Sequence, residues 1–356
     1  MKKPCTVLII FIMMFGVIIQ TGCSDRKYIS SRSSSQKITI GFSIDNLQQE
    51  RWYIDKDTFV KEAEKLDADV IVNVAYNNAD TQISQVKDMV AKGIDVLVII
   101  PYDCRKAAVA VNYAKKNGVK VIAYDRLVLN ADVDLYASFD NEKVGTLQAN
   151  AMIKAVSKGN YVIINGPSTD YNTVMINKGI MDVLNKYIKA GQIKIVKQIV
   201  TKDWSADEAS DSIAKLLKDD THIDAIIAEN DTLAAGAIDA LAEYHLISSV
   251  PVVGMDADIA ACQRVVEEQQ LMTVYKPISK LATAAADVAV KLAKNEKITF
   301  SEKINDGKYD VPYLKIEPLA VDKENMYSTV IKDGFHTVEE VYMNVPKSQW
   351  PEDKNK

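Results

Sequence analysis

The segment Met272-Thr273-Val274-Tyr275-Lys276-Pro277 has the composition of a short β-strand that stops at its proline. β-Branched and aromatic residues favour strands, and a proline cannot continue a central strand. The alanine-rich run 281–294, which has the composition of a helix, follows at once. A lysine at the end of such a strand lies where open α/β sheets bind ligands, so Lys276 is a candidate for a site between two lobes.

Strand-like and helix-like runs alternate on both sides of this segment. In the first half, strands are predicted at 38–42, 69–74, 95–100 and 119–124, and helices at 52–66, 81–92, 106–117 and 142–156. In the second half, strands are predicted at 161–165, 193–200, 225–228, 251–255 and 271–275, and helices at 173–188, 206–218, 232–244 and 257–268. Continuous Val/Ile runs joined by helices are typical of parallel sheets covered on both faces. The sequence therefore predicts an α/β fold with two doubly wound parallel-sheet lobes.

Length and composition agree with two cores and exclude several classes of function. The chain has 356 residues, of which 48% are hydrophobic and 26% are charged, and at this length two cores are expected rather than one. The formal net charge of −5 argues against a nucleic-acid partner, because phosphate binding requires a basic face. The four cysteines show no C-x-x-C spacing and the three histidines are scattered, so neither a metal site nor a cofactor is predicted. Cys104 and Cys262 are expected to be buried thiols, because a disulfide between two lobes would oppose their relative motion.

The amino terminus has the order of a secretory signal. Lys2-Lys3 precede an apolar run at 7–19, and Thr21-Gly22-Cys23-Ser24 follows it. The apolar run is shorter than the about 20 residues that a transmembrane helix needs. Thr-Gly-Cys resembles a bacterial lipobox, which predicts a signal at 1–23 and lipidation at Cys23.

Gln20 stands where a lipobox prefers an aliphatic residue, so simple cleavage and an uncleaved anchor are alternatives to lipidation. The serine-rich segment 24–36 has the composition of a flexible tether. The folded part is therefore expected to be extracytoplasmic and tethered to the outer face of the cytoplasmic membrane through its N-terminal anchor.

Polar and aromatic residues follow the predicted strands in both halves of the chain. The candidates for ligand binding are Arg51, Trp52, Asp125 and Arg126 in the first half, and Asn172, Trp204, Asn230, Asp256 and Lys276 in the second, with Asp45 and Glu50 as further candidates. A neutral polyol fits this set, because its hydroxyls donate to carboxylates and accept from Arg, Lys and Asn side chains. Tryptophan rings can cover the apolar face of a sugar. No nucleophile–base pair and no glycine-rich phosphate loop accompany these residues, so an enzyme is not predicted.

Each candidate taken singly also has an ordinary structural role. Asp125 and Arg126 can form a surface ion pair, and Trp52 can be a core residue. Asn230 and Asp256 can cap the helices that follow them. The recurrence of such residues at strand ends in both halves is what favours a binding site.

Several segments closely resemble the D-xylose-binding branch of the type I, or ribose-binding-like, periplasmic sugar-binding proteins. These segments are 50–52, 96–102, 123–126, 138–145, 230–231, 256–258, 272–277 and 330–335. The match runs from about residue 38 to 335, whereas 165–171 matches only loosely. The resemblance implies the type I periplasmic binding protein fold, in which three hinge strands join the two lobes.

The resemblance also implies lobe boundaries and roles for the candidates. The hinges would lie near Ser138, Lys276 and Pro312, with an N-terminal lobe at 37–138 plus 278–312, a C-terminal lobe at 139–277 plus 313–345, and a surface tail at 346–356. Hydrogen-bonding positions of the family fall on Arg51, Asp125, Arg126, Asn230, Asp256 and Lys276, and ring-stacking positions on Trp52 and Trp204. Asn172 directly follows the loosely matching segment.

D-xylose is the ligand that the resemblance implies, and two kinds of membrane protein could respond to closure of the lobes. One is the permease of an ABC sugar transporter, with this chain as its solute-binding subunit. The other is the ectodomain of a LytS-type sensor histidine kinase, with this chain as a xylose-sensing co-receptor in two-component signalling. A sugar-responsive repressor shares these lobes, but a secretion signal stands where its DNA-binding helices would be.

Overall fold

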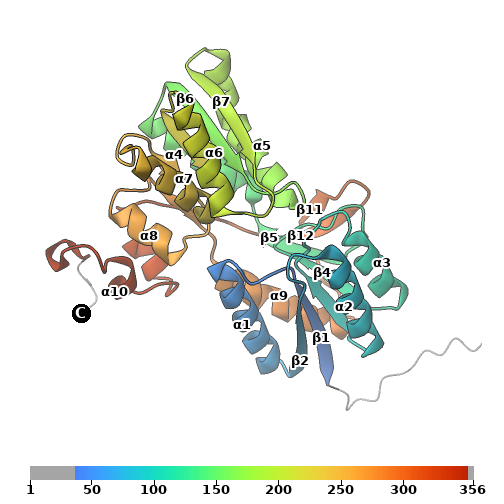
Figure 1. The fold of residues 1–356 in the computed structure, drawn as a ribbon. Helices are drawn as coiled ribbons and strands as arrows, with labels where there is room; N and C mark the ends of the chain where they lie inside the picture. The colour runs from blue at the N-terminus through green and yellow to red at the C-terminus, as the bar shows by residue number, and fades with distance from the viewer. Residues whose placement is uncertain (1–36, 352–356) are drawn as a thin grey trace, which may run out of the picture. The chain divides into compact units, whose positions relative to one another are not determined.

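Seven strands form the first of two large sheets in the computed structural model, which describes residues 37–351 (Figure 1). Its order is β11 (Glu302–Asn305), β12 (Asp310–Ile316), β5 (Leu135–Phe139), β4 (Lys120–Tyr124), β3 (Val96–Ile99), β1 (Ile38–Ile44) and β2 (Ala68–Val74). All neighbours are parallel except β11 and β12. The predicted signal, the lipidation at Cys23 and the predicted tether lie outside the described residues.

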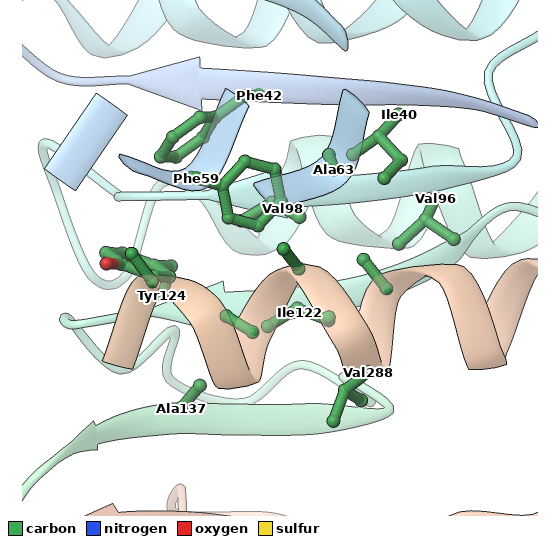
Figure 2. Close-up of a cluster of buried hydrophobic side chains, with 14 of the residues drawn as sticks. Ile40, Phe42, Phe59, Ala63, Val96, Val98, Ile122, Tyr124, Ala137 and Val288 are labelled. Carbon is green, nitrogen blue, oxygen red and sulfur yellow. The ribbon is translucent and has the colours of Figure 1, made fainter. Parts of the chain in front are cut away.

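Apolar side chains cover both faces of this sheet, because its central strands are continuous hydrophobic runs. Helices α1 (Glu50–Lys65) and α9 (Ile278–Ala293) pack together on one face, and α2 (Ala79–Ala91) and α3 (Ala108–Lys116) on the other. Figure 2 shows the first of these cores, in which Phe42, Phe59 and Tyr124 meet between the strands and α1. The ring centroids of Phe42 and Phe59 are 4.7 Å apart.

The second large sheet repeats the same architecture with four parallel strands (Figure 1). Their order is β7 (Ile193–Val200), β6 (Gly159–Asn165), β8 (Ala225–Ala228) and β9 (Val252–Val253). One face is covered by α4 (Asn141–Ala155) and α5 (Tyr171–Lys189), the other by α6 (Ala206–Lys218) and α7 (Asp231–Glu243). Two doubly wound α/β lobes are thus confirmed.

Two glycines set the close approach of α4 and α5. A Cβ at Gly179 would lie 1.9 Å from the carbonyl oxygen of Glu142, and one at Gly145 would lie 2.0 Å from that of Ile176. The backbones of the two helices therefore touch, with no room for a side chain between them.

Gly179→Ala is expected to lower the free energy of unfolding by about 3 kcal/mol, because the clash is with backbone and can be relieved only by moving a helix. Urea unfolding of the wild type and the variant measures this change in the free energy of unfolding. Gly191→Asn is the control, since Gly191 follows α5 in open space at φ +68°, a conformation that asparagine tolerates. Equal, small effects of both substitutions would contradict the packing argument.

The chain crosses between the lobes three times. It leaves the first sheet after Phe139 and returns to it at Lys276-Pro277, between β10 (Thr273–Tyr275) and α9. The third crossing lies between Ile316 and β13 (Leu319–Val321), a strand that pairs antiparallel with β10. The pairing of β12 with β5 runs to Ile316, so this crossing lies a few residues after the predicted hinge near Pro312.

The C-terminal part of the chain packs against α8 (Ile259–Val266) on the second lobe. It contains a π-helical turn (Tyr327–Ile331), α10 (Val338–Val341) and a 3-10 turn (Lys347–Gln349). Its apolar side chains form a core with Cys262, Val265 and Tyr275. Trp350 packs against this core, so the predicted surface tail is attached to the lobe up to that residue.

The two described cysteines, Cys104 and Cys262, are free and buried, as predicted. Within residues 37–351, no helix is long and apolar enough to span a bilayer.

Candidate functional site

All nine predicted ligand-binding residues line one cavity between the lobes. These residues are Arg51, Trp52, Asp125, Arg126, Asn172, Trp204, Asn230, Asp256 and Lys276. About 250 Å³ between them, open solvent included, is not filled by protein atoms, and the enclosed part of this space has room for about one water molecule.

Arg51 forms ion pairs with three buried carboxylates in and beside the cavity. It lies in the first turn of α1, so the helix directs it across the end of the first sheet. Its guanidinium contacts Asp55 at 3.1 Å and Asp125 at 2.7 Å within its own lobe, and Asp256 of the second lobe at 3.3 Å. Its Cζ atom also lies 4.3 Å from the centroid of the Trp52 ring. Arg51 therefore links the two lobes through a network of buried charges.

Arg126 forms a second link of the same kind. One nitrogen, Nη1, donates to Asp45 of the first lobe at 2.6 Å, while Nε lies 2.6 Å from a carboxylate oxygen of Asp170 in the second lobe. Asp125 and Arg126 are both buried, which excludes the surface ion pair that the sequence also allowed. Asp125 has φ +59°, a left-handed conformation that aims its side chain and that of Arg126 into the cavity wall.

The second lobe contributes residues at helix starts. Asn172 lies in the first turn of α5, and its Nδ2 atom donates to Asp125 Oδ2 at 3.2 Å. Asn230 caps α7 by accepting from the Leu233 amide at 2.9 Å, so its structural role is present beside its place in the cavity. Trp204 has φ +52°, and its ring lies so close to Gly166 that a Cβ there would be 2.4 Å away.

Asp256 and Lys276 form the third part of the cavity, where the hinge strand β10 ends. Lys276 Nζ lies 2.9 Å from Asp256 Oδ1, and the same oxygen is the one that contacts Arg51. Both side chains are buried. A carboxylate between two cations is thus held at the boundary of the lobes.

The charges of this network raise and lower each other's pKa. Burial would lower the pKa of the Arg51 guanidinium, but Asp125, Asp55 and Asp256 raise it well above its ordinary value. Burial would raise the pKa of Asp125, but Arg51, Lys276 and Arg126 outweigh it and lower that pKa. Both groups therefore stay ionised at neutral pH, as charge-assisted hydrogen bonds to a ligand require.

Other buried carboxyls near the cavity behave in the opposite way. Burial raises the pKa of Asp45 and Asp55 to about 6, that of Asp231 to about 7 and that of Glu229 to about 8. Glu229 has no cation beside it in the described structure, and its oxygens accept from Asn165 Nδ2 and the Gly166 amide, both at 2.7 Å. Glu229 thereby fixes the glycine on which Trp204 packs.

The free energy of unfolding is expected to fall as the pH rises from 5 to 8. Because these carboxyls have a higher pKa in the folded than in the unfolded chain, the folded state binds more protons across this interval, and its advantage is lost as pH passes the folded pKa values. Glu229→Gln removes the largest of these shifts, so the fall in the free energy of unfolding between pH 5 and 8 should be smaller in the variant by about 3 kcal/mol. Urea unfolding at several pH values measures this, and an unchanged slope in the variant would contradict it.

Sequence reasoning missed three residues that line the cavity and one that supports it. Gln49, Asp170 and Met255 each precede a predicted candidate or a helix start, and Asp55 lies one helical turn after Arg51. The i, i+4 spacing of Arg51 and Asp55 on a helix could have indicated their pairing. Glu50, a predicted candidate, does not line the cavity; its carboxylate accepts from the Ile259 amide of the other lobe at 3.1 Å. No three acidic, histidine or cysteine side chains within 37–351 could hold a metal ion.

Further contacts join the lobes outside the cavity. Asn77 donates to Asp203 at 2.8 Å, and the Cys104 amide donates to the Thr169 carbonyl oxygen at 2.8 Å. Met175 of α5 packs into the apolar core beneath α2 and α3. Contacts that involve none of the cavity's charged residues thus also hold the two lobes together.

Comparison with known proteins places this architecture among binding proteins. A family model described as a periplasmic binding protein domain matches residues 40–297. A D-xylose-binding periplasmic protein of Haemophilus influenzae is 46% identical over 88% of this chain and 95% of its own length. Its Escherichia coli counterpart is 42% identical over 91% and 98%. A solved ABC transporter solute-binding protein from Clostridium phytofermentans with bound β-D-glucose is 28% identical, with a TM-score of 0.79 over 85% of this chain and 99% of that one.

Proposed function

Because this chain belongs to the periplasmic binding protein family and is a sugar-binding member of it, we propose that it binds D-xylose in the cavity between its lobes and presents the closed form to a membrane protein. The observation that carries this proposal is the convergence of the nine polar and aromatic residues on one cavity between the lobes. The relatives are binding proteins of extracytoplasmic location, and this chain is likewise an extracytoplasmic binding protein and not an enzyme.

The chemistry of the cavity suits a pentose. Asp125 and Asp256 accept from sugar hydroxyls, while Arg51, Arg126, Lys276 and the amides of Asn172 and Asn230 donate to them. Trp52 and Trp204 supply apolar ring faces from opposite lobes. A pentose lacks the exocyclic hydroxymethyl group of a hexose, so a cavity packed at that edge selects for it.

Binding favours closure because the contacts come from both lobes. A ligand that touches both binds the closed arrangement better than the open one and shifts the population toward it. Moving the equilibrium from 1:99 to 99:1 requires ~5.5 kcal/mol of preference. A few charge-assisted hydrogen bonds, at about 1.5–3 kcal/mol each, supply that preference.

Calorimetric titration of the purified protein with D-xylose tests this function. The expected dissociation constant is micromolar or lower, a binding free energy of about −8 kcal/mol, with weaker binding of D-glucose. Small-angle scattering should show a more compact molecule at saturating xylose. Absence of binding heat together with unaltered scattering and melting temperature would refute the proposal.

As the membrane partner we propose an ABC permease, with this chain as the solute-binding subunit of a sugar transporter. The similar solute-binding protein with bound glucose supports this choice. Deleting the chain should then abolish high-affinity xylose uptake. If uptake persists but the genes that xylose normally induces are no longer expressed in response to it, the partner is instead a sensor histidine kinase of the LytS type. Crosslinking to membranes with and without xylose identifies the protein that is bound.

We also propose that Cys23 is lipidated and tethers the folded lobes to the outer face of the cytoplasmic membrane. The lipobox-like order Thr21-Gly22-Cys23 supports it. Labelling cells with an alkyne fatty acid should mark the wild-type chain and not Cys23→Ser. Labelling of both, or of neither, would contradict lipidation at this residue.

A further inference from the structure

The loop that carries Asp256 has an unusual backbone. Asp256 has φ +102° and the next residue, Ala257, has φ +55°, although neither is glycine. Such conformations are sparsely populated and persist only where the surrounding structure fixes them. They turn the Asp256 carboxylate toward Arg51 and Lys276. The contacts that hold this loop therefore also determine the position of the Asp256 carboxylate in the cavity.

Part of the support is local. The Asp256 amide donates to the Val274 carbonyl oxygen at 2.9 Å, and the Ala257 amide donates to Thr273 Oγ1 at 3.1 Å. The Ala257 carbonyl oxygen accepts from the Cys262 thiol at 3.4 Å and lies 2.8 Å from Nε2 of His336, a residue of the C-terminal segment. His336 is only 7% exposed, and as Nε2 is the atom that faces a carbonyl oxygen, it carries the hydrogen and donates.

The same C-terminal segment also holds the strand that leads to Lys276. Phe335 packs with its ring centroid 4.4 Å from that of His336 and 5.1 Å from that of Tyr275. The Tyr275 hydroxyl donates to Asp333 at 2.6 Å. Asp333, Phe335 and His336 thus clamp the residues next to both members of the Asp256–Lys276 ion pair, without lining the cavity themselves.

We propose that His336 is a positioning residue for sugar binding, which holds the left-handed turn at Ala257 and through it the Asp256 carboxylate. The inference rests on the proposed function of the cavity, because it assigns Asp256 to the ligand. It gives the C-terminal segment after β13 a role in affinity, although that segment lies outside the cavity.

A mutant cycle separates positioning from general stabilisation. His336→Leu should raise the dissociation constant for D-xylose about tenfold, the equivalent of one hydrogen bond. His336→Gln, whose amide can donate to the same carbonyl oxygen, should restore most of the affinity. In an Asp256→Asn background, His336→Leu should change the constant less than about twofold, because the effect passes through the residue already altered. The control is His222→Gln, since the His222 side chain is 77% exposed.

A second measurement needs no sugar. Hydrogen exchange should quicken in His336→Leu at the amides of 254–258, more than elsewhere in the second lobe, and return to normal in His336→Gln. Equal affinity losses in both backgrounds, no rescue by glutamine, or faster exchange spread evenly over the lobe would each overturn the inference. If wild-type protein does not bind xylose, the proposed function fails, and the exchange pattern alone decides whether His336 holds the loop.

Discussion

Arg51→Ala is expected to abolish measurable xylose binding and to lower the free energy of unfolding by about 3–5 kcal/mol. The guanidinium is buried among Asp55, Asp125 and Asp256, and it contacts all three. Without it, carboxylates that burial already disfavours are left close together with fewer cations. Removing one partner of a buried ion pair lowers the stability far more than replacing the whole pair with apolar residues.

Calorimetry and urea unfolding measure the two effects of Arg51→Ala separately. Arg105→Ala is the matched control, because Arg105 is exposed and donates only to the Ser168 carbonyl oxygen and weakly to a thiol in the described contacts. Arg105→Ala should change both the xylose affinity and the free energy of unfolding only slightly. Arg51→Lys should bind sugar poorly too, since a single ammonium cannot reach three carboxylates in the geometry of the guanidinium fork. Near-normal xylose binding in Arg51→Ala would refute the assignment of Arg51 to the ligand.

Asp256→Ala should raise the dissociation constant for xylose about 100-fold or more, a loss of roughly 3 kcal/mol. Asp256 is the second lobe's acceptor for Arg51 and the partner of Lys276, so its removal takes away the proposed ligand contact and also leaves two buried cations with one carboxylate fewer. The free energy of unfolding should fall less than in Arg51→Ala, because Asp125 and Asp55 remain beside the guanidinium.

Asp287→Ala removes the same charge from a half-buried position on α9, where the carboxylate pairs with Lys291, and provides the control. Surface ion pairs of this kind contribute little, so xylose affinity and stability should remain close to those of the wild type. The double variant Arg51→Ala/Asp256→Ala should lose less stability than the sum of the single losses, because the two residues contact each other. If the two losses of stability add up, the contact between Arg51 and Asp256 contributes nothing measurable to the free energy of unfolding.

The order of strands and helices was predictable because each element is a local pattern. Val96–Ile99 and Ala225–Ala228 are uninterrupted apolar runs, which predict buried parallel strands by themselves. Strand β5, Leu135–Phe139, was not predicted, because its mixed sequence becomes a strand through its ladders to β4 and β12. A hinge was predicted near Pro312, and the parallel pairing of β12 with β5, from Tyr313 to Ile316, is a contact between distant segments that the local sequence does not show.

For the cavity, the sequence by itself determined the chemistry available: carboxylates, cations, amides and tryptophans at strand ends, with their roles suggested by the resemblance to sugar-binding proteins. Only the tertiary structure decided which charges meet. Arg51 reaches Asp256 across 205 positions of the chain, and the Ala257 carbonyl oxygen meets His336 across 79. Residue type and local pattern report what a side chain can do, but its partners depend on contacts between distant segments, which form only when two lobes and a C-terminal segment have packed together.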